Sequence, residues 1–177
     1  MAHAQRTRPV DAGGARAGGV RGGLARHALL PLRLFLGGTF LYAGLQKLTD
    51  PAFPAASGKG SLGELLGQVH DTAALPQLVG LAQHGPVGFA YALAGGQVLV
   101  GIGTLVGLLG RLAAFGGALI SLSLWLTVSW PASPYYYGND LAYLLAWTPL
   151  VLAGTATFSL DAALANRRER HGTQLYG

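Results

Sequence analysis

Four long apolar stretches constrain the fold of this chain more than any other feature. They cover residues 28–48, 86–109, 112–130 and 141–160. Each is close to the roughly 20 residues that an α-helix needs to cross about 30 Å of hydrocarbon. A helix pairs its backbone groups internally, whereas an isolated strand in lipid would leave them unpaired. The sequence therefore predicts an all-α membrane protein, a bundle of four transmembrane helices in direct contact with membrane lipid.

Composition narrows the classes of cofactor and partner. Only 11% of the residues are charged, against roughly a quarter in soluble domains, and 51% are apolar. The net charge of +5 lies mainly near the chain ends and follows no nucleic-acid-binding motif, so we expect no nucleic-acid partner. The chain has no cysteine, and no histidine falls inside an apolar stretch. We therefore expect no metal, haem or iron–sulfur cofactor.

The distribution of basic residues predicts how the chain is oriented in the membrane. Five arginines precede the first stretch, Arg111 lies between the second and third, and three arginines follow the fourth. The other side carries only Lys47 and Lys59. Positive loops stay in the cytoplasm, so we expect a multi-pass protein of a bacterial or archaeal cell membrane with both termini cytoplasmic. Its divisions are a disordered basic tail (1–26), a four-helix domain (27–161) and a second basic tail (162–177). A cleaved signal peptide is the alternative for the first stretch, but no convincing cleavage site follows it.

The segment between the first two stretches, residues 49–85, is the longest connection. Pro51 and Pro54 end the first helix. Ser61 and Glu64 have the spacing of a capping box, and apolar residues follow at helical intervals. This pattern predicts one or two amphipathic helices that lie on the outer membrane face or cap the bundle. An ordered loop without function is the alternative.

Polar residues form a stripe along the first stretch. Arg33, Gly37, Phe40, Gly44 and Lys47 recur at intervals of three and four, which places them on one helix face. An ionisable group in hydrocarbon costs at least about 2.5 kcal/mol, so such residues are candidates for function. The two glycines would let another helix approach closely. The alternative for Arg33 is that its side chain snorkels to the membrane surface.

Two carboxylates flank the fourth stretch. Asp140, at its outer end, is level with Lys47, and Asp161, at its inner end, is closer to Arg33. We predict that Lys47 pairs with Asp140 and that Arg33 pairs with Asp161. Asp140 could instead, or in addition, cap its helix or act as a first-turn acid. Gln97 falls near the middle of the second stretch, where an amide usually bonds a neighbouring helix; the alternative is contact with a quinone or another substrate.

Small residues predict where the other helices pack. Gly96, Gly103, Gly107, Gly116 and Gly117 are the predicted packing positions, and the spacing of Gly103 and Gly107 matches a GxxxG pattern.

These motifs, taken in order, resemble the DoxX/DoxD family of small four-helix membrane proteins. The resemblance rests on the first stretch, on a glycine-rich hairpin that ends at Arg111, and on Ser-Leu-Asp at residues 159–161 after Asp140. Gln97 stands where many members carry glutamate, which argues against a role that needs an acid there. The DoxD branch is associated with the membrane subunit of thiosulfate:quinone oxidoreductase.

The resemblance implies a membrane subunit of a quinone-linked oxidoreductase assembly that is not catalytic by itself. It also implies a bound quinone, together with a partner subunit or a homo-oligomer. Arg33, Lys47, Gln97 and Asp140 are the candidate polar contacts to the quinone or proton path, and Asp161 is a further bundle contact. Tyr143, Trp125 and Trp147 are candidates for ring packing. The alternatives are a non-catalytic scaffold that recruits a soluble redox enzyme, and a small transporter.

Overall fold

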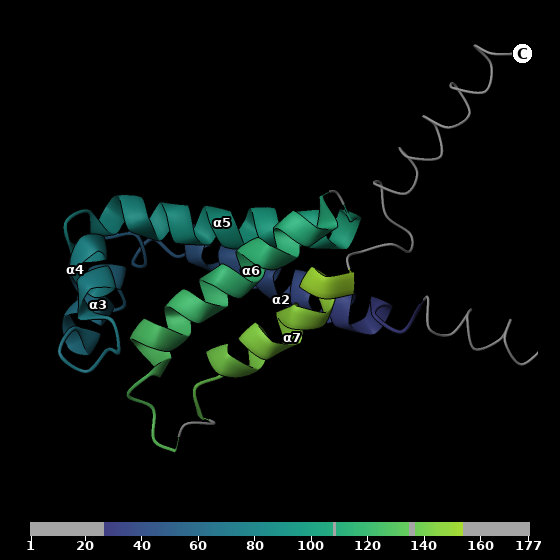
Figure 1. Cartoon of the computed structure of the whole chain (residues 1–177). Coiled ribbons are helices and arrows are strands. Elements are labelled where there is room, and N and C mark those ends of the chain that lie inside the picture. Colours follow the sequence, from purple (N-terminus) through teal and green to yellow (C-terminus); the bar gives the residue numbers. More distant parts are fainter. Residues whose placement is uncertain (1–26, 108, 135–136, 154–177) are drawn as a thin grey trace, which may run out of the picture.

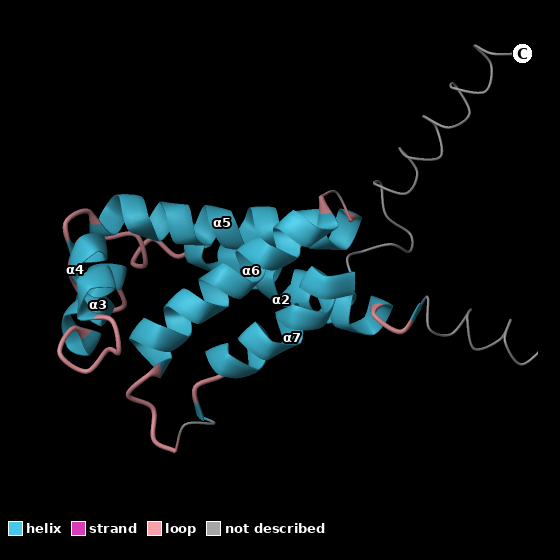
Figure 2. Ribbon diagram, in the orientation of Figure 1, coloured by secondary structure: helices cyan, strands magenta, loops and turns pink. Residues whose placement is uncertain are grey.

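The computed structural model describes residues 27–107, 109–134 and 137–153, and within these ranges the chain is helical and contains no strand. Figures 1 and 2 show the arrangement. The helices follow one another in this order: α2 (Leu30–Thr49), α3 (Leu62–Val69), α4 (Pro76–Gln83), α5 (Pro86–Val106), α6 (Gly110–Leu124), the π-helix η1 (Trp125–Ser129) and α7 (Asp140–Ala153).

Two of these segments have the length and apolarity of a membrane span. They are α5, with 21 residues, and α6 continued by η1, with 20. Helix α2 has 20 residues and includes Arg33 and Lys47. Helix α7 is a shorter apolar helix of 14 residues, and the remainder of the predicted fourth stretch lies outside the described residues. The predicted class, an all-helical membrane protein, agrees with this architecture.

Helix α5 ends earlier than the sequence predicts. Gly107 has φ = 71°, the left-handed conformation that favours glycine at the end of a helix, and its N–H donates to the Gly103 carbonyl at 2.9 Å. Gly107 is buried and ends the helix, so it has a capping role that the sequence does not predict, and its packing role in a GxxxG pair stays a prediction.

Helix α2 packs along α5, and glycines make this contact possible. A Cβ atom on Gly44 would lie 2.7 Å from the Ala94 carbonyl oxygen. One on Gly101 of α5 would lie 2.6 Å from the Leu41 backbone nitrogen, and one on Gly37 would lie 2.8 Å from a side-chain atom. The backbones approach so closely that no side chain fits between them. The predicted close approach at the glycine stripe is confirmed, and its partner is α5.

Helices α6 and α7 form the second closely packed pair. The Trp147 indole lies directly against Gly117, where a Cβ atom would clash with the ring. Phe40 of α2 meets the same indole edge-on, with ring centroids 5.0 Å apart. Trp147 is fully buried and belongs to the central apolar cluster. Helices α2 and α7 contact each other far less than either contacts its main partner, so a seam, here called the α2–α7 seam, runs between the two pairs.

Helices α3 and α4 cover one end of the long helices, here called the capped end (Figure 1). Ser61 is the N-cap of α3 and accepts a bond of 3.1 Å from the Glu64 N–H, so this half of the predicted capping box is confirmed. The Glu64 carboxylate accepts from the Gly60 N–H at 2.8 Å. The predicted amphipathic helices are both present, and their apolar faces are buried together.

Helices α3 and α4, here together called the cap, are hydrogen-bonded to the bundle through η1. The linker between α3 and α4 donates two backbone N–H groups, from Ala74 and Leu75, to the Leu126 carbonyl at 2.9 and 3.4 Å. A short π-helix within a longer helix is an irregularity that often occurs at functional sites. Here η1, which continues α6, supplies the carbonyl group that binds the cap.

Candidate functional site

Arg33 lies at the end of the bundle opposite the cap and is 4% exposed. Its Nε and Nη2 groups donate to the carbonyls of Thr104 and Leu105, each at 2.6 Å. These carbonyls belong to the last turn of α5, where the helix supplies no partner of its own and a positive charge is favoured. Arg33 thus caps α5 from another helix, and it faces the bundle instead of snorkelling. Its predicted partner Asp161 lies outside the described residues.

Lys47 and Asp140 lie at the capped end. Lys47 Nζ donates to the Ala43 carbonyl at 3.3 Å and stands 5.8 Å from the centre of the Phe53 ring, within cation–π range. Asp140 is the first residue of α7 and accepts a hydrogen bond from the Ser129 hydroxyl of η1. The Lys47 and Asp140 charges attract one another through space, but no direct ion pair joins these two described side chains. Asp140 is therefore a first-turn acid whose direct partner is Ser129.

Four polar side-chain atoms in the bundle interior have no hydrogen-bond partner within the described part of the chain. They are Gln97 Oε1, Thr104 Oγ1, Ser121 Oγ and Trp147 Nε1. All four residues are at most 4% exposed. The hydrogen bond to a neighbouring helix that the sequence predicts for Gln97 is not made by its Oε1 atom. The sequence gives no direct sign that Ser121 and Trp147 would also carry buried polar atoms without a partner.

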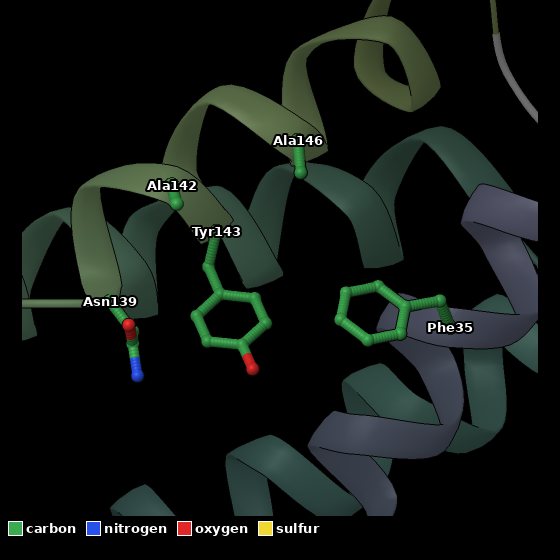
Figure 3. A pocket seen from close by; sticks show the side chains of 5 residues that line it. All are labelled: Phe35, Asn139, Ala142, Tyr143 and Ala146. Carbon is green, nitrogen blue, oxygen red and sulfur yellow. The ribbon is translucent and has the colours of Figure 1, made fainter. Parts of the chain in front are cut away.

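A groove of about 370 Å³ lies at the α2–α7 seam. Figure 3 shows the rings of Phe35 and Tyr143 next to one another at the groove, with Asn139 beside Tyr143. The two rings are nearly parallel, at 16°, with centroids 6.1 Å apart. Ala142 and Ala146 complete the wall. The small alanine side chains keep the space between the two helices open.

The groove contains few of the residues that the sequence singles out. Of the three aromatic candidates, only Tyr143 lines it; Trp147 is buried in the core and Trp125 packs against Trp130. Its walls do not include Arg33, Lys47, Gln97 or Asp140. The sequence pattern does not mark Phe35 or Asn139, because Phe35 lies off the polar stripe and Asn139 precedes its helix. No group of three or more histidine, aspartate or glutamate side chains in the described ranges is placed to hold a metal ion.

These observations define the class of the protein: a small helical membrane protein in which two helix pairs meet at a grooved seam. The chain belongs to the DoxX family, whose sequence model matches residues 28–130. No curated protein and no solved structure matches the chain. The family match covers α2 to η1, so α7 and its side of the groove lie beyond it.

Proposed function

We propose that α2, α5, α6 with η1, and α7 each cross the membrane, with both chain ends in the cytoplasm and the cap outside. The cap, Lys47 and Asp140 share one end of the bundle, while Arg33 and Arg111 lie toward the other, which carries the arginine-rich chain ends in this topology. Reporter fusions test this topology. A phosphatase that is active only outside should be active when inserted at Gly58, in the exposed loop before α3, and inactive when fused to either terminus.

We propose further that the protein is a DoxX-type membrane subunit of a quinone-linked oxidoreductase assembly, with thiosulfate:quinone oxidoreductase as the specific candidate. The groove at the α2–α7 seam is the observation that carries this proposal. Its volume of about 370 Å³ lies at the lower end of the range for small-molecule sites. A quinone head group fits a site of this size, and its isoprenoid tail would remain in lipid.

The chemistry of the groove also suits a quinone ring. Phe35 and Tyr143 offer aromatic faces to a planar ring. The Tyr143 hydroxyl and the Asn139 amide are hydrogen-bond donors for quinone carbonyl oxygens. Phe35 is 56% exposed, so the groove opens on the surface that faces lipid in the proposed topology. A quinone would enter from the bilayer without crossing the bundle.

Electrons must come from a partner. Reduction of a quinone to a quinol takes up two electrons and two protons. The chain has no cysteine with which to hold an iron–sulfur cluster or oxidise a sulfur compound by thiol exchange. In this proposal a partner subunit oxidises the reduced sulfur compound and the DoxX subunit holds the quinone that accepts the electrons. The isolated chain is then not catalytic by itself.

Purification with the native partners, followed by lipid extraction and quinone titration, tests this function. Replacing Tyr143 by Leu or Asn139 by Ala should weaken quinone binding about tenfold, which corresponds to about 1.4 kcal/mol. The matched control is Leu145→Ala, because Leu145 lies on α7, outside the groove, and is 61% exposed. Equal quinone affinity in the groove variants and the control would refute the groove site. Stable partner capture without quinone reduction would instead favour the scaffold.

A further inference from the structure

Three of the unpartnered polar atoms lie around the middle of the bundle and come from three different helices. Gln97 Oε1 belongs to α5, Ser121 Oγ to α6 and Trp147 Nε1 to α7. The exposed fractions of these residues are 4%, 1% and 0%. None of the three atoms has a partner among the described residues, although nearly all buried polar groups in proteins do.

Packing contacts place the three residues within about one helical turn of one another along the bundle. The Trp147 ring lies against Gly117, and the closest ring atom is Cε2, to which Nε1 is bonded. Ser121 is four residues beyond Gly117, on the same face of α6 and one turn away. Gln97 lies between Gly96, whose Cβ position is 3.6 Å from Ile120, and Val100, which is 3.2 Å from the Cβ position of Gly116. Gln97 is therefore level with the segment of α6 that carries Gly117 and Ser121.

The hydrogen-bonding character of the three atoms specifies a ligand. The indole Nε1–H is an obligate donor, the amide Oε1 is an obligate acceptor, and the serine hydroxyl is both. A bare carbonyl oxygen accepts from the indole but offers no hydrogen, so the amide oxygen would then depend on the Ser121 hydroxyl for a donor. An O–H group satisfies both, because its oxygen accepts from Trp147 while its hydrogen is donated to Gln97.

We propose that Gln97, Ser121 and Trp147 form a buried binding site for a hydroxyl oxygen. Two sources share this chemistry: a water molecule held inside the bundle, and the hydroxyl of a quinol. Only the second source rests on the proposed function. A quinol carries such a hydroxyl and a quinone does not, so under this proposal the Trp147 indole responds to the quinol.

Nuclear magnetic resonance of protein labelled with ¹⁵N-tryptophan tests this site. The chain has three tryptophans, so three indole N–H signals are expected, and Trp147→Phe assigns the one of interest. In detergent-purified protein freed of quinone, a cross-peak between water and the Trp147 N–H identifies water as the ligand. A shift of this signal on addition of ubiquinol, but not of ubiquinone, identifies the quinol hydroxyl. The site is overturned if neither effect occurs, and equal shifts with ubiquinone and ubiquinol without a water cross-peak also overturn it.

Substitutions separate this site from general effects on the fold. Gln97→Leu removes the acceptor at similar volume and should abolish the cross-peak or the quinol-induced shift, with the other two indole signals unchanged. Should this variant not fold, Gln97→Met makes the same test with a more flexible side chain. The matched control is Ser123→Ala, because the Ser123 hydroxyl already donates to the Leu119 carbonyl at 2.9 Å. A response of the Trp147 signal that survives both Gln97 substitutions would overturn the site.

The same experiment distinguishes failure of this site from failure of the proposed function. The water measurement requires neither a partner nor turnover. A protein that shows the water cross-peak but reduces no quinone with its partners retains the hydroxyl site and loses the quinone role. A protein that reduces quinone but shows no Trp147 response retains the quinone role and loses this site.

Discussion

Replacing Arg33 by Met tests whether a side chain of one helix caps another. Met has similar length and high helix propensity, so α2 should still form. The substitution removes the guanidinium that bonds the Thr104 and Leu105 carbonyls, each at 2.6 Å. Those carbonyls lie in the last turn of α5, where the helix has no N–H group to offer them.

The magnitude follows from these two bonds. A hydrogen bond to a charged group contributes about 1.5–3 kcal/mol, so the pair at the lower value contributes about 3 kcal/mol. Interhelical bonds in membranes average about 0.6 kcal/mol, which sets a floor near 1.2 kcal/mol for two. Arg33 is 4% exposed, so water cannot readily replace either bond. We therefore expect Arg33→Met to lower the free energy of unfolding by about 3 kcal/mol.

Reversible unfolding in mixed micelles with a rising fraction of dodecyl sulfate measures this change. Arg111→Met is the matched control, because Arg111 also donates to a carbonyl of another helix, Leu152, but is exposed and bonds at 3.3 Å. Its expected cost is below about 0.5 kcal/mol, the usual scale for a surface substitution. If the two variants lose stability equally, to within about 0.5 kcal/mol, burial and short bonds do not distinguish Arg33, and the capping role is refuted.

Two further predictions concern the glycine contact between α2 and α5 and the N-cap of α3. Gly101→Ala should cost about 1–3 kcal/mol in the same unfolding assay, because its Cβ would lie 2.6 Å from the backbone of Leu41. Gly95→Ala, with nothing within 4 Å of its Cβ position, should be neutral or stabilising, and an equal loss in both would contradict the glycine contact. Ser61→Ala should cost about 1 kcal/mol and speed hydrogen exchange in α3, because it removes the N-cap bond to Glu64. Ser57→Ala should leave hydrogen exchange in α3 unchanged. If Ser61→Ala also leaves it unchanged, Ser61 is not a stabilising N-cap of α3.

The amino-acid sequence predicts the helical class, the approximate helix bounds and several local features. Apolar length, helical spacing and the Ser61 capping box depend on residues close together in the chain. The glycine stripe showed that some helix would approach α2 closely, because only residues without side chains permit that contact. The stripe did not identify the partner helix, because any of several apolar helices could make such a contact.

The partners of the polar side chains, in contrast, depend on how the helices pack together. Arg33 bonds carbonyls 71 and 72 positions away, and every residue has a carbonyl, so no side-chain pattern marks the acceptor. Asp140 bonds Ser129 instead of contacting Lys47 directly, because the turn into α7 places the hydroxyl closer than the ammonium. The groove and the three unpartnered atoms arise where separate helices meet. Periodicity fixes which face of a helix is apolar, but only the crossing of the helices decides which side chains lie opposite one another.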